Sequence, residues 1–405
     1  MARRLAADGH EVAVITTNAR EARDFWRPAG SQSRALATRE MMDQVSVERS
    51  SLFYPQPSPY VFGILRRMGV LLQLARVPSA LAKPVQRKIA HWMPPLHGFS
   101  QAAYSKASQV DLIQAVDASW DGLLMASAAA AEAHGKPLVV VPFMHTGTPT
   151  IRAHYQMAHQ VEVYHKARVV VALSEGEAAA YQALGVPSER VHVIPMGIEL
   201  VAELPKPSEV QSFREKHGLG DHVVAFVGAN TADKGALTLV EAILRLNQEG
   251  TPVDAVFIGP NAQDFLGKLR SQFAEDSMIT ERVRIWGVVD DSTKHLLLEC
   301  CDLVALPSQV ETFGMVFLEA WQHGKPVVGC NVGGIPELVS DEETGLLVPY
   351  GDVSALAAAI RRLLVTPELA QRIGNAGRTK LPQYSWDRTY RQLLEIYEGA
   401  LSGPL

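Results

Sequence analysis

The sequence predicts an α/β protein with two domains, each a doubly wound parallel sheet with helices on both faces. Short apolar runs that predict buried strands alternate with helical segments along most of the chain. The chain has 405 residues, of which 47% are hydrophobic, and this is enough for two domains of ordinary size.

The stretch 301–330 combines a strand, a loop and a helix, and the rest of the second domain is organised around it. Cys301–Leu306 is a short apolar run that predicts a buried parallel strand, and the helix after the loop begins at Gly314. Open α/β sheets bind ligands at the carboxyl ends of their strands. The N–H groups near Met315 and Val316, at the start of this helix, favour an anion such as a phosphate.

Two carboxylates flank the predicted anion site. Glu311 lies in the loop, and Glu319 lies on a helical turn that can face the same ligand. A carboxylate accepts hydrogen bonds from paired hydroxyls, such as those of a ribose or a hexose. N–H groups that bind an anion, with one such carboxylate on each side, suit a ligand in which a sugar, a diphosphate and a ribose follow one another. The alternative is an ordinary helix with a solvated Glu.

The segment E-T-F-G-x-V-x-L-E-A, which carries both carboxylates, resembles the signature of the retaining nucleotide-sugar glycosyltransferases of family 4. Those enzymes have the GT-B fold, in which two Rossmann-like domains face each other across a cleft. The resemblance continues through Gly333–Val339 and Thr344–Pro349 and covers nearly the whole chain. It implies that Glu311 orients sugar hydroxyls and that Glu319 contacts the ribose. Further donor contacts are implied for Phe313, Gly314, Met315 and Val316.

The resemblance also implies the domain boundaries. Ile194–Gly197 is similar to the family's interdomain strand, usually I-P-N-G, with Met196 in place of the common Asn. The family pattern then implies an acceptor-binding domain over 1–197 and a nucleotide-sugar-binding domain over 198–384. The remaining segment, 385–405, is implied to be a helix that crosses back to the first domain.

The pattern of the first residues is typical of the middle of an α/β unit and not of its start. Ala2–Gly9 predicts a helix end and His10–Thr17 predicts a strand, whereas residues 20–50 are polar and predict irregular structure. Family members begin earlier, with a first strand and a glycine-rich loop, about thirty residues in all. The resemblance therefore implies a first domain that lacks its first strand. The alternative is a divergent N-terminus.

The stretch from Ser50 to Val110 contains no Asp or Glu. Basic residues alternate there with apolar and aromatic residues on predicted helices, which favours an anionic membrane surface as partner. The alternative is a pair of ordinary helices with solvated basic faces. The basic residues are Arg66, Arg67, Arg76, Lys83, Arg87, Lys88 and Lys106.

His145 follows the predicted buried strand Leu138–Pro142 of the first domain. A lone His is more often structural or solvated than functional. The matching position in the family is a His that contacts the donor sugar, so the resemblance implies a catalytic role for His145.

The loop before Lys234 resembles the family's G-R-x-x-x-x-K-G phosphate loop. The resemblance implies that Gly228 borders the donor and that Lys234 holds its diphosphate. Ala229 occupies the position of the family's arginine, and two cations stabilise more charge on a leaving diphosphate than one. The missing arginine implies a slower enzyme, a shifted geometry, or a second cation from elsewhere, for which Lys294 and His295 are the candidates.

The loop Val288–Lys294 resembles the base-binding loop of bacterial phosphatidylinositol mannosyltransferases. The resemblance implies donor contacts from Val289, Asp291 and Lys294. A carboxylate can accept both edge donors of guanine, whereas uracil offers one such N–H. The alternative is that Asp291 caps the helix that begins near Ser292.

Composition narrows the function classes. The net charge of −5 gives no general affinity for nucleic acid, and three cysteines fit a reduced, cytoplasmic protein. No apolar run approaches the ~20 residues of a membrane span. No D-x-D motif occurs, so we expect no metal and no other cofactor, with Lys234 and a helix N-terminus neutralising the diphosphate.

The family resemblance, the missing D-x-D motif and the acid-free stretch together imply a metal-independent, retaining glycosyltransferase on the inner membrane face. It would move a hexosyl group, mannose in the case of a GDP-sugar, from a GDP- or UDP-sugar to a lipid-linked or glycan acceptor of the cell envelope. Related lipopolysaccharide and exopolysaccharide glycosyltransferases share the pattern. The alternatives are a sugar phosphorylase or epimerase on the same fold, and a non-catalytic donor-binding homologue.

Overall fold

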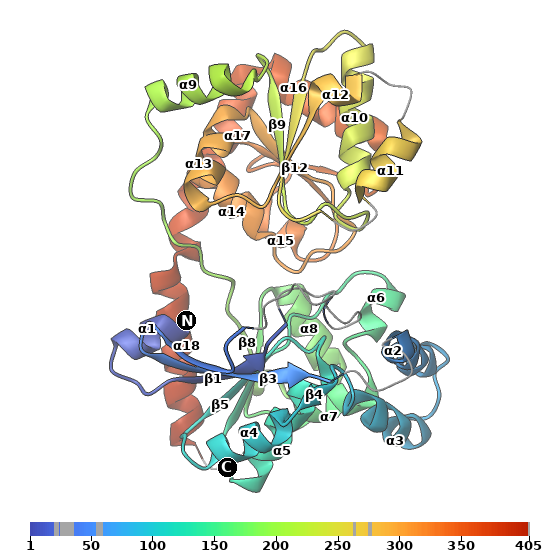
Figure 1. Ribbon diagram of the computed structural model, residues 1–405, viewed down its shortest axis with the longest axis vertical. Helices are drawn as coiled ribbons and strands as arrows, with labels where there is room; N and C mark the ends of the chain where they lie inside the picture. The colour runs from blue at the N-terminus through green and yellow to red at the C-terminus, as the bar shows by residue number, and fades with distance from the viewer. Residues whose placement is uncertain (20–23, 25–35, 54–59, 262–264, 274–277, 404–405) are drawn as a thin grey trace. The chain divides into compact units, whose positions relative to one another are not determined.

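The computed structural model describes residues 1–19, 24, 36–53, 60–261, 265–273 and 278–403 (Figure 1). The chain divides into two compact units, Met1–Ile194 with Tyr390–Leu405 (unit 1) and Pro195–Thr389 (unit 2). The first unit thus ends at Ile194, whereas the family pattern implies a boundary at 197. The last helix, α18 (Trp386–Ser402), contributes its residues from Tyr390 onward to unit 1.

Unit 2 is a six-stranded parallel sheet in the order β11-β10-β9-β12-β13-β14, covered by helices on both faces (Figure 1). Its central strands are apolar runs buried on both faces, as β12 is along its whole length. The strands are β9 (Val223–Val227), β10 (Asp254–Ile258), β11 (Val283–Gly287), β12 (Leu303–Leu306), β13 (Val327–Cys330) and β14 (Leu346–Val348). The predicted doubly wound α/β class is confirmed for this unit.

The strand order of unit 2 reverses between β9 and β12. From β9 the chain builds outward through β10 to β11, and it then returns to place β12 on the other side of β9. Such a switch point is where ligands bind in open α/β sheets. The helices are α9 (Pro207–His217), α10 (Ala236–Gln248), α11 (Phe265–Gln272), α12 (Met278–Arg282), α13 (Asp291–Cys300), α14 (Met315–Gln322), α15 (Ile335–Leu338), α16 (Val353–Val365) and α17 (Pro367–Lys380).

Unit 1 contains two sheets. One is parallel, in the order β5-β6-β7-β8, and α18 packs Leu393 and Ala400 against one of its faces. In the other, β3 pairs in parallel with β1 and antiparallel with β2 and β4. The strands are β1 (Ala13–Thr17), β2 (Arg39–Met42), β3 (Val45–Leu52), β4 (Leu96–His97), β5 (Ile113–Val116), β6 (Leu138–Val141), β7 (Val169–Ala172) and β8 (Val191–Val193).

The prediction of irregular structure over residues 20–50 is wrong for β2 and β3. Val45 and Val47 are buried while their neighbours face outward, so β3 is a half-buried strand of alternating pattern. Asp43 and Gln44 both have positive φ, 48° and 66°, and they form the two-residue turn of the β2–β3 hairpin. Residues 20–23 and 25–35 lie outside the described part of the chain.

The helices of unit 1 cover its sheets and add a pair, α2 and α3, at one edge (Figure 1). None of the described helices is long and apolar enough to cross a bilayer. The helices are α1 (Ala2–Ala7), α2 (Tyr60–Leu74), α3 (Ser79–Ala90), α4 (Phe99–Ala107), α5 (Asp121–Ala133), α6 (Pro149–Ala153), α7 (Ala158–Lys166) and α8 (Glu175–Ala183).

Candidate functional site

The switch point of unit 2 brings Lys234 and Glu311 together. Lys234 follows β9 and Glu311 follows β12, and these neighbouring strands end at the same edge of the sheet. Lys234 Nζ donates to Glu311 Oε2 at 2.9 Å and to the Val310 carbonyl at 3.1 Å. The side chains are 25% and 15% exposed, so both can still contact a ligand.

A close backbone approach places Lys234 against the loop that carries Glu311. Gly235 caps α10 in the left-handed region, with φ of 74°. A Cβ at this position would lie 2.1 Å from the Pro307 carbonyl oxygen, so only glycine allows the contact.

Two glycines hold the Glu311 loop from its other side. A Cβ on Gly333 would lie 2.0 Å from the Glu311 carbonyl oxygen, and one on Gly334 would lie 2.0 Å from the Thr312 carbonyl oxygen. The Gly334 N–H donates to the Glu311 carbonyl at 3.2 Å. The Gly333–Gly334 pair therefore fixes the backbone on which Glu311 is mounted.

The N-terminus of α14 lies directly after this loop. Gly314 caps the helix with φ of 91°, and its carbonyl accepts from the Phe317 N–H. The N–H groups of Met315 and Val316 have no hydrogen-bond partner among the described residues and can bind an anion. Phe313 is buried with its ring against Tyr384, so only its backbone can contact a ligand.

A second lysine–carboxylate pair involves Glu319 of α14 and Lys294 of α13. Lys294 Nζ lies 3.3 Å from Glu319 Oε1 and 3.5 Å from Asp291 Oδ1. The Asp291 side chain is 91% exposed, whereas Lys294 and Glu319 are each about a quarter exposed. Unit 2 therefore brings Glu319, Lys294 and Asp291 together, as the predicted donor contacts require.

The alternative reading of Asp291 as a helix cap is wrong, because Asp290 is the cap of α13. Asp290 Oδ1 accepts from the Thr293 N–H at 2.7 Å and from the Ser292 hydroxyl at 2.8 Å. These hydrogen bonds, first of all the one from Thr293, lower the pKa of Asp290. The Asp291 carboxylate makes no such contact and remains available, and Val289 lies half-buried in the preceding loop.

Ala229 occupies the position of the family's arginine, and neither of the two proposed replacements, Lys294 and His295, is a free cation. Lys294 is held by Glu319, and His295 Nδ1 lies 2.9 Å from His323 Nε2. Burial, then the neighbouring His323 and Lys294, lower the pKa of His295, so the neutral imidazole is favoured. The His295–His323 contact continues to a third side chain, because His323 Nδ1 donates to Glu299 at 2.7 Å. No motif in the sequence indicates this chain of contacts.

His145 follows β6 in unit 1, whereas the other predicted site residues belong to unit 2. Phe143 has a φ of 56°, an unfavourable conformation for a residue with a side chain, and it turns the chain at the end of the strand. Buried Glu177 holds this turn, accepting from the Met144 N–H at 2.7 Å. The His145 ring packs edge-on against Tyr155, with centroids 5.3 Å apart.

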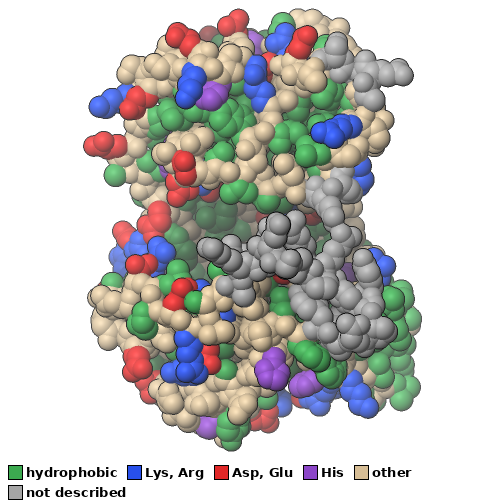
Figure 2. Space-filling view, in the orientation of Figure 1, with side chains coloured by type: hydrophobic (Ala, Val, Ile, Leu, Met, Phe, Trp, Pro, Cys, Tyr) green, Lys and Arg blue, Asp and Glu red, His purple; other side chains and the backbone are tan. Residues whose placement is uncertain are grey.

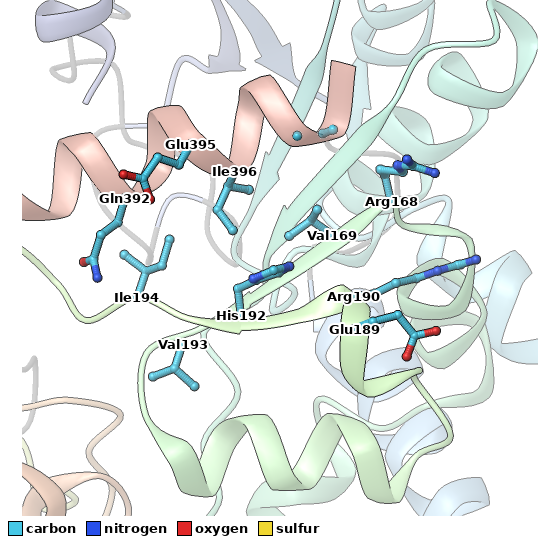
Figure 3. Close-up of a pocket in the computed structure, with 12 residues that line it drawn as sticks. Arg168, Val169, Glu189, Arg190, His192, Val193, Ile194, Gln392, Glu395 and Ile396 are labelled. Carbon is cyan, nitrogen blue, oxygen red and sulfur yellow. The ribbon is translucent and has the colours of Figure 1, made fainter. Parts of the chain in front are cut away.

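A cavity of about 670 Å³ in unit 1 contains none of the predicted site residues (Figure 3). It is lined by residues of the edge strand β8 and of α18, and the side chains of His192 and Ile396 point toward each other. The candidate site is therefore not this cavity. Among the described residues, no three His, Cys, Asp or Glu side chains are grouped so that they could hold a metal ion.

In the comparison with known proteins, each half of the chain matches a model of a glycosyltransferase domain. Residues 1–197 match the family model "Glycosyl transferase 4-like domain", and residues 208–380 match "Glycosyl transferases group 1". Each domain thus matches a glycosyltransferase domain model, and the fold class is that of the GT-B glycosyltransferases. The predicted family resemblance is confirmed at this level, and the narrower resemblance to mannosyltransferases remains a prediction.

Several relatives of these glycosyltransferase domains match part of the chain. The chain is 30% identical over 247 residues to the D-inositol 3-phosphate glycosyltransferase of Jonesia denitrificans, covering 58% of each chain. It is 33% identical over 264 residues to the alpha-maltose-1-phosphate synthase of Mycolicibacterium smegmatis, covering 60% of this chain and 66% of that one. The chain thus spans about half to two thirds of the length of such relatives.

Solved structures support the fold. The crystal structure of Anabaena HepE in complex with UDP-glucose matches with a TM-score of 0.68 and 24% identity, over 88% of this chain and 87% of that one. Sucrose-phosphate synthase from Thermosynechococcus elongatus matches with a TM-score of 0.68 and 21% identity, over 98% and 91%. At these identities the likeness concerns the fold alone.

Proposed function

We propose that the protein is a retaining glycosyltransferase that moves a hexosyl group from a GDP- or UDP-sugar to a lipid-linked or glycan acceptor. The carrying observation is the pair of lysine–carboxylate contacts, Lys234–Glu311 and Lys294–Glu319, on the two sides of the α14 N-terminus. The donor diphosphate binds to the free N–H groups of α14 and to Lys234. Glu311 orients the sugar hydroxyls, and Glu319 accepts from the ribose.

In this proposal the chemistry is stabilisation of a leaving diphosphate. Lys234 and the α14 N–H groups are fixed before the reaction and face the charge that develops as the sugar–phosphate bond breaks. For His145, the family resemblance implies a contact with the transferred sugar. The departing phosphate accepts the acceptor's proton, so the proposal requires no further general base.

Donor turnover tests this function. Purified protein is incubated with GDP-mannose and with UDP-glucose, with and without a lipid extract as acceptor, and the nucleotide released and the anomeric configuration of the product are measured. Acceptor-dependent release with a retained anomer is expected, and it should persist in EDTA. Tight donor binding without release would instead support the donor-binding homologue that Ala229 suggests.

We expect the nucleotide preference to depend on Asp291. Because its carboxylate is exposed and is not used as a helix cap, it can accept both edge N–H groups of guanine. Calorimetric titration should show GDP binding more tightly than UDP, and Asp291→Ala should weaken GDP about tenfold, the loss of one charged hydrogen-bonding partner.

The matched control for Asp291→Ala is Glu281→Ala, which removes an exposed acid of α12 and should leave GDP binding unchanged. Asp290→Ala is unsuitable for this purpose, because it removes the cap of α13. Tighter binding of UDP than of GDP would overturn the guanine assignment.

The outer faces of α2 and α3 support docking to a membrane. α2 buries Gly69 and Val70, yet its opposite face exposes a row of apolar side chains at helical spacing. Large exposed apolar patches mark interaction surfaces. The exposed residues of the two helices and the turn after them are Val61, Ile64, Met68, Leu71, Leu74, Leu81, Val85 and Trp92.

Basic residues accompany this apolar face, which we call the docking face. Arg67 and Lys88 are exposed on α2 and α3, and Figure 2 shows hydrophobic and basic side chains together at the edge of unit 1 that carries these helices. Residues 54–59 of the acid-free stretch, and the side chains of Tyr60 and Phe62, lie outside the described part. An apolar face bordered by cations fits an anionic bilayer.

We predict that Ile64→Ser with Leu71→Ser weakens binding to anionic vesicles about 100-fold, since each lost apolar side chain costs about 1.5 kcal/mol. Both positions are exposed, so folding should be unaffected. The matched control is Leu200→Ser with Val365→Ser, which changes two exposed apolar residues of unit 2. Sedimentation with vesicles measures the effect, and equal losses in both double variants would contradict the docking face.

A further inference from the structure

A basic groove lies beside the docking face, at the turn between α2 and α3. Its volume is about 680 Å³, within the range of small-molecule sites. One wall is formed by Arg76 and Val77 of the turn and by Ser79, the first residue of α3, and the other is α7. The remaining lining is Gln73, Ala82, Lys83, Gln156, Ala158, Val161, Glu162, His165, Lys166 and Leu184.

Several cations converge on a single carboxylate in this groove. Glu162 contacts Lys83 at 2.6 Å and Arg87 through a short hydrogen bond, and Lys166 lies 3.5 Å away. Glu132, at 2.8 Å from Lys166, is the other acid in these contacts. Although partial burial opposes it, the hydrogen bond from Lys83 and the surrounding cations lower the pKa of Glu162, so its charge is retained.

Arg76 adds a further cation that the protein itself does not neutralise. Its side chain has no hydrogen bond or ion pair among the residues that the structure describes. Its backbone is held at a φ of 53°, a conformation that side-chain-bearing residues rarely adopt. Such strain persists where the surrounding structure requires it, and here the strained turn brings Arg76 to the lining of the groove.

The groove combines this positive rim with an apolar floor. Val77, Ala82, Val161 and Leu184 line it, and the exposed apolar residues Leu74 and Leu81 flank the turn that forms its rim. A ligand bound there would therefore contact the cations and lie beside the residues that we place in the bilayer. A phosphate with a short apolar attachment matches both properties.

We propose that the groove between the α2–α3 turn and α7 binds the phosphate headgroup of an anionic phospholipid, with Arg76, Lys83 and Lys166 as its partners. The groove belongs to unit 1, whereas the candidate residues for the donor nucleotide and diphosphate are in unit 2. The inference deepens the proposed membrane docking, on which it rests, by adding one specific headgroup contact to a general electrostatic attraction.

The test compares two double variants that each remove two positive charges. Arg76→Gln with Lys166→Gln changes the groove, and Arg67→Gln with Lys88→Gln changes the exposed docking face. With vesicles of phosphatidylcholine and phosphatidylglycerol, the groove variant should bind about tenfold more weakly than the docking-face variant. Equal losses would mean that only overall charge matters and would overturn the headgroup site.

A soluble short-chain lipid tests the headgroup site independently of vesicle binding. Dihexanoyl phosphatidylglycerol, kept below its micellar concentration, should bind the wild type saturably and the groove variant at least about tenfold more weakly, by calorimetry. If the wild type bound the soluble lipid but no vesicles, the headgroup site would stand and the membrane docking would fail. Absence of saturable lipid binding, or equally tight binding of inorganic phosphate, would overturn the lipid site.

Discussion

Glu311→Gln is expected to lower kcat about 100-fold, the size of a lost transition-state contact. The carboxylate is placed by the Gly333–Gly334 backbone and held by Lys234 at 2.9 Å. Glutamine keeps the shape of the side chain but accepts more weakly from sugar hydroxyls. Because the proposed contact strengthens as the sugar–phosphate bond breaks, kcat should fall more than donor affinity.

Glu319→Gln is the matched control, since Glu319 is also a partly exposed carboxylate paired with a lysine, at 3.3 Å. Its proposed partner is the ribose, which does not change charge during transfer, so the donor KM should rise while kcat stays within a few-fold. Steady-state kinetics with varied donor concentrations separate the two outcomes. Near-normal kinetics of Glu311→Gln would contradict the assignment of the stretch 301–330 to donor binding.

The buried parts of the fold could be predicted from the sequence because their signal is local. β12 and β6 are apolar runs of four residues, each buried along its length, and a short apolar run followed by a helical segment is typical of a parallel strand. The same reasoning failed for β2 and β3. All four residues of β2 are exposed, and the pairing of β3 with distant β1 leaves no local mark beyond the alternation of Val45 and Val47.

The candidate site was predictable in its residue types but not in its pairings. Lys234 and Glu311 are far apart in sequence, and their contact depends on β9 and β12 being neighbours, which only the strand order establishes. Likewise, a choice between Asp290 and Asp291 as the cap of α13 requires the position of the first helical turn. The Glu299–His323–His295 chain depends on packing of α13 against the residues after α14, which no motif encodes.

Lys234→Met is expected to have the largest effect, lowering kcat/KM about 1,000-fold. With Ala229 in place of an arginine and with His295 favoured as the neutral imidazole, Lys234 is the cation on which the proposed diphosphate stabilisation depends. Methionine keeps much of the length of the side chain but removes its charge and its contacts to Glu311 and Val310.

The matched control for this substitution is Lys294→Met, which removes the other lysine–carboxylate contact. Lys294 pairs with Glu319 at 3.3 Å, and its proposed partners are the base and the ribose, so its loss should weaken donor binding about tenfold and change kcat little. Single-turnover measurements at saturating donor compare the two variants directly. Because Lys234 and Glu311 are in contact, the double variant Lys234→Met with Glu311→Gln should lose less than the product of the single losses. Full additivity would show that Lys234 and Glu311 act independently. Equal effects of the two lysines would show that Lys234 does not act on the reacting phosphate.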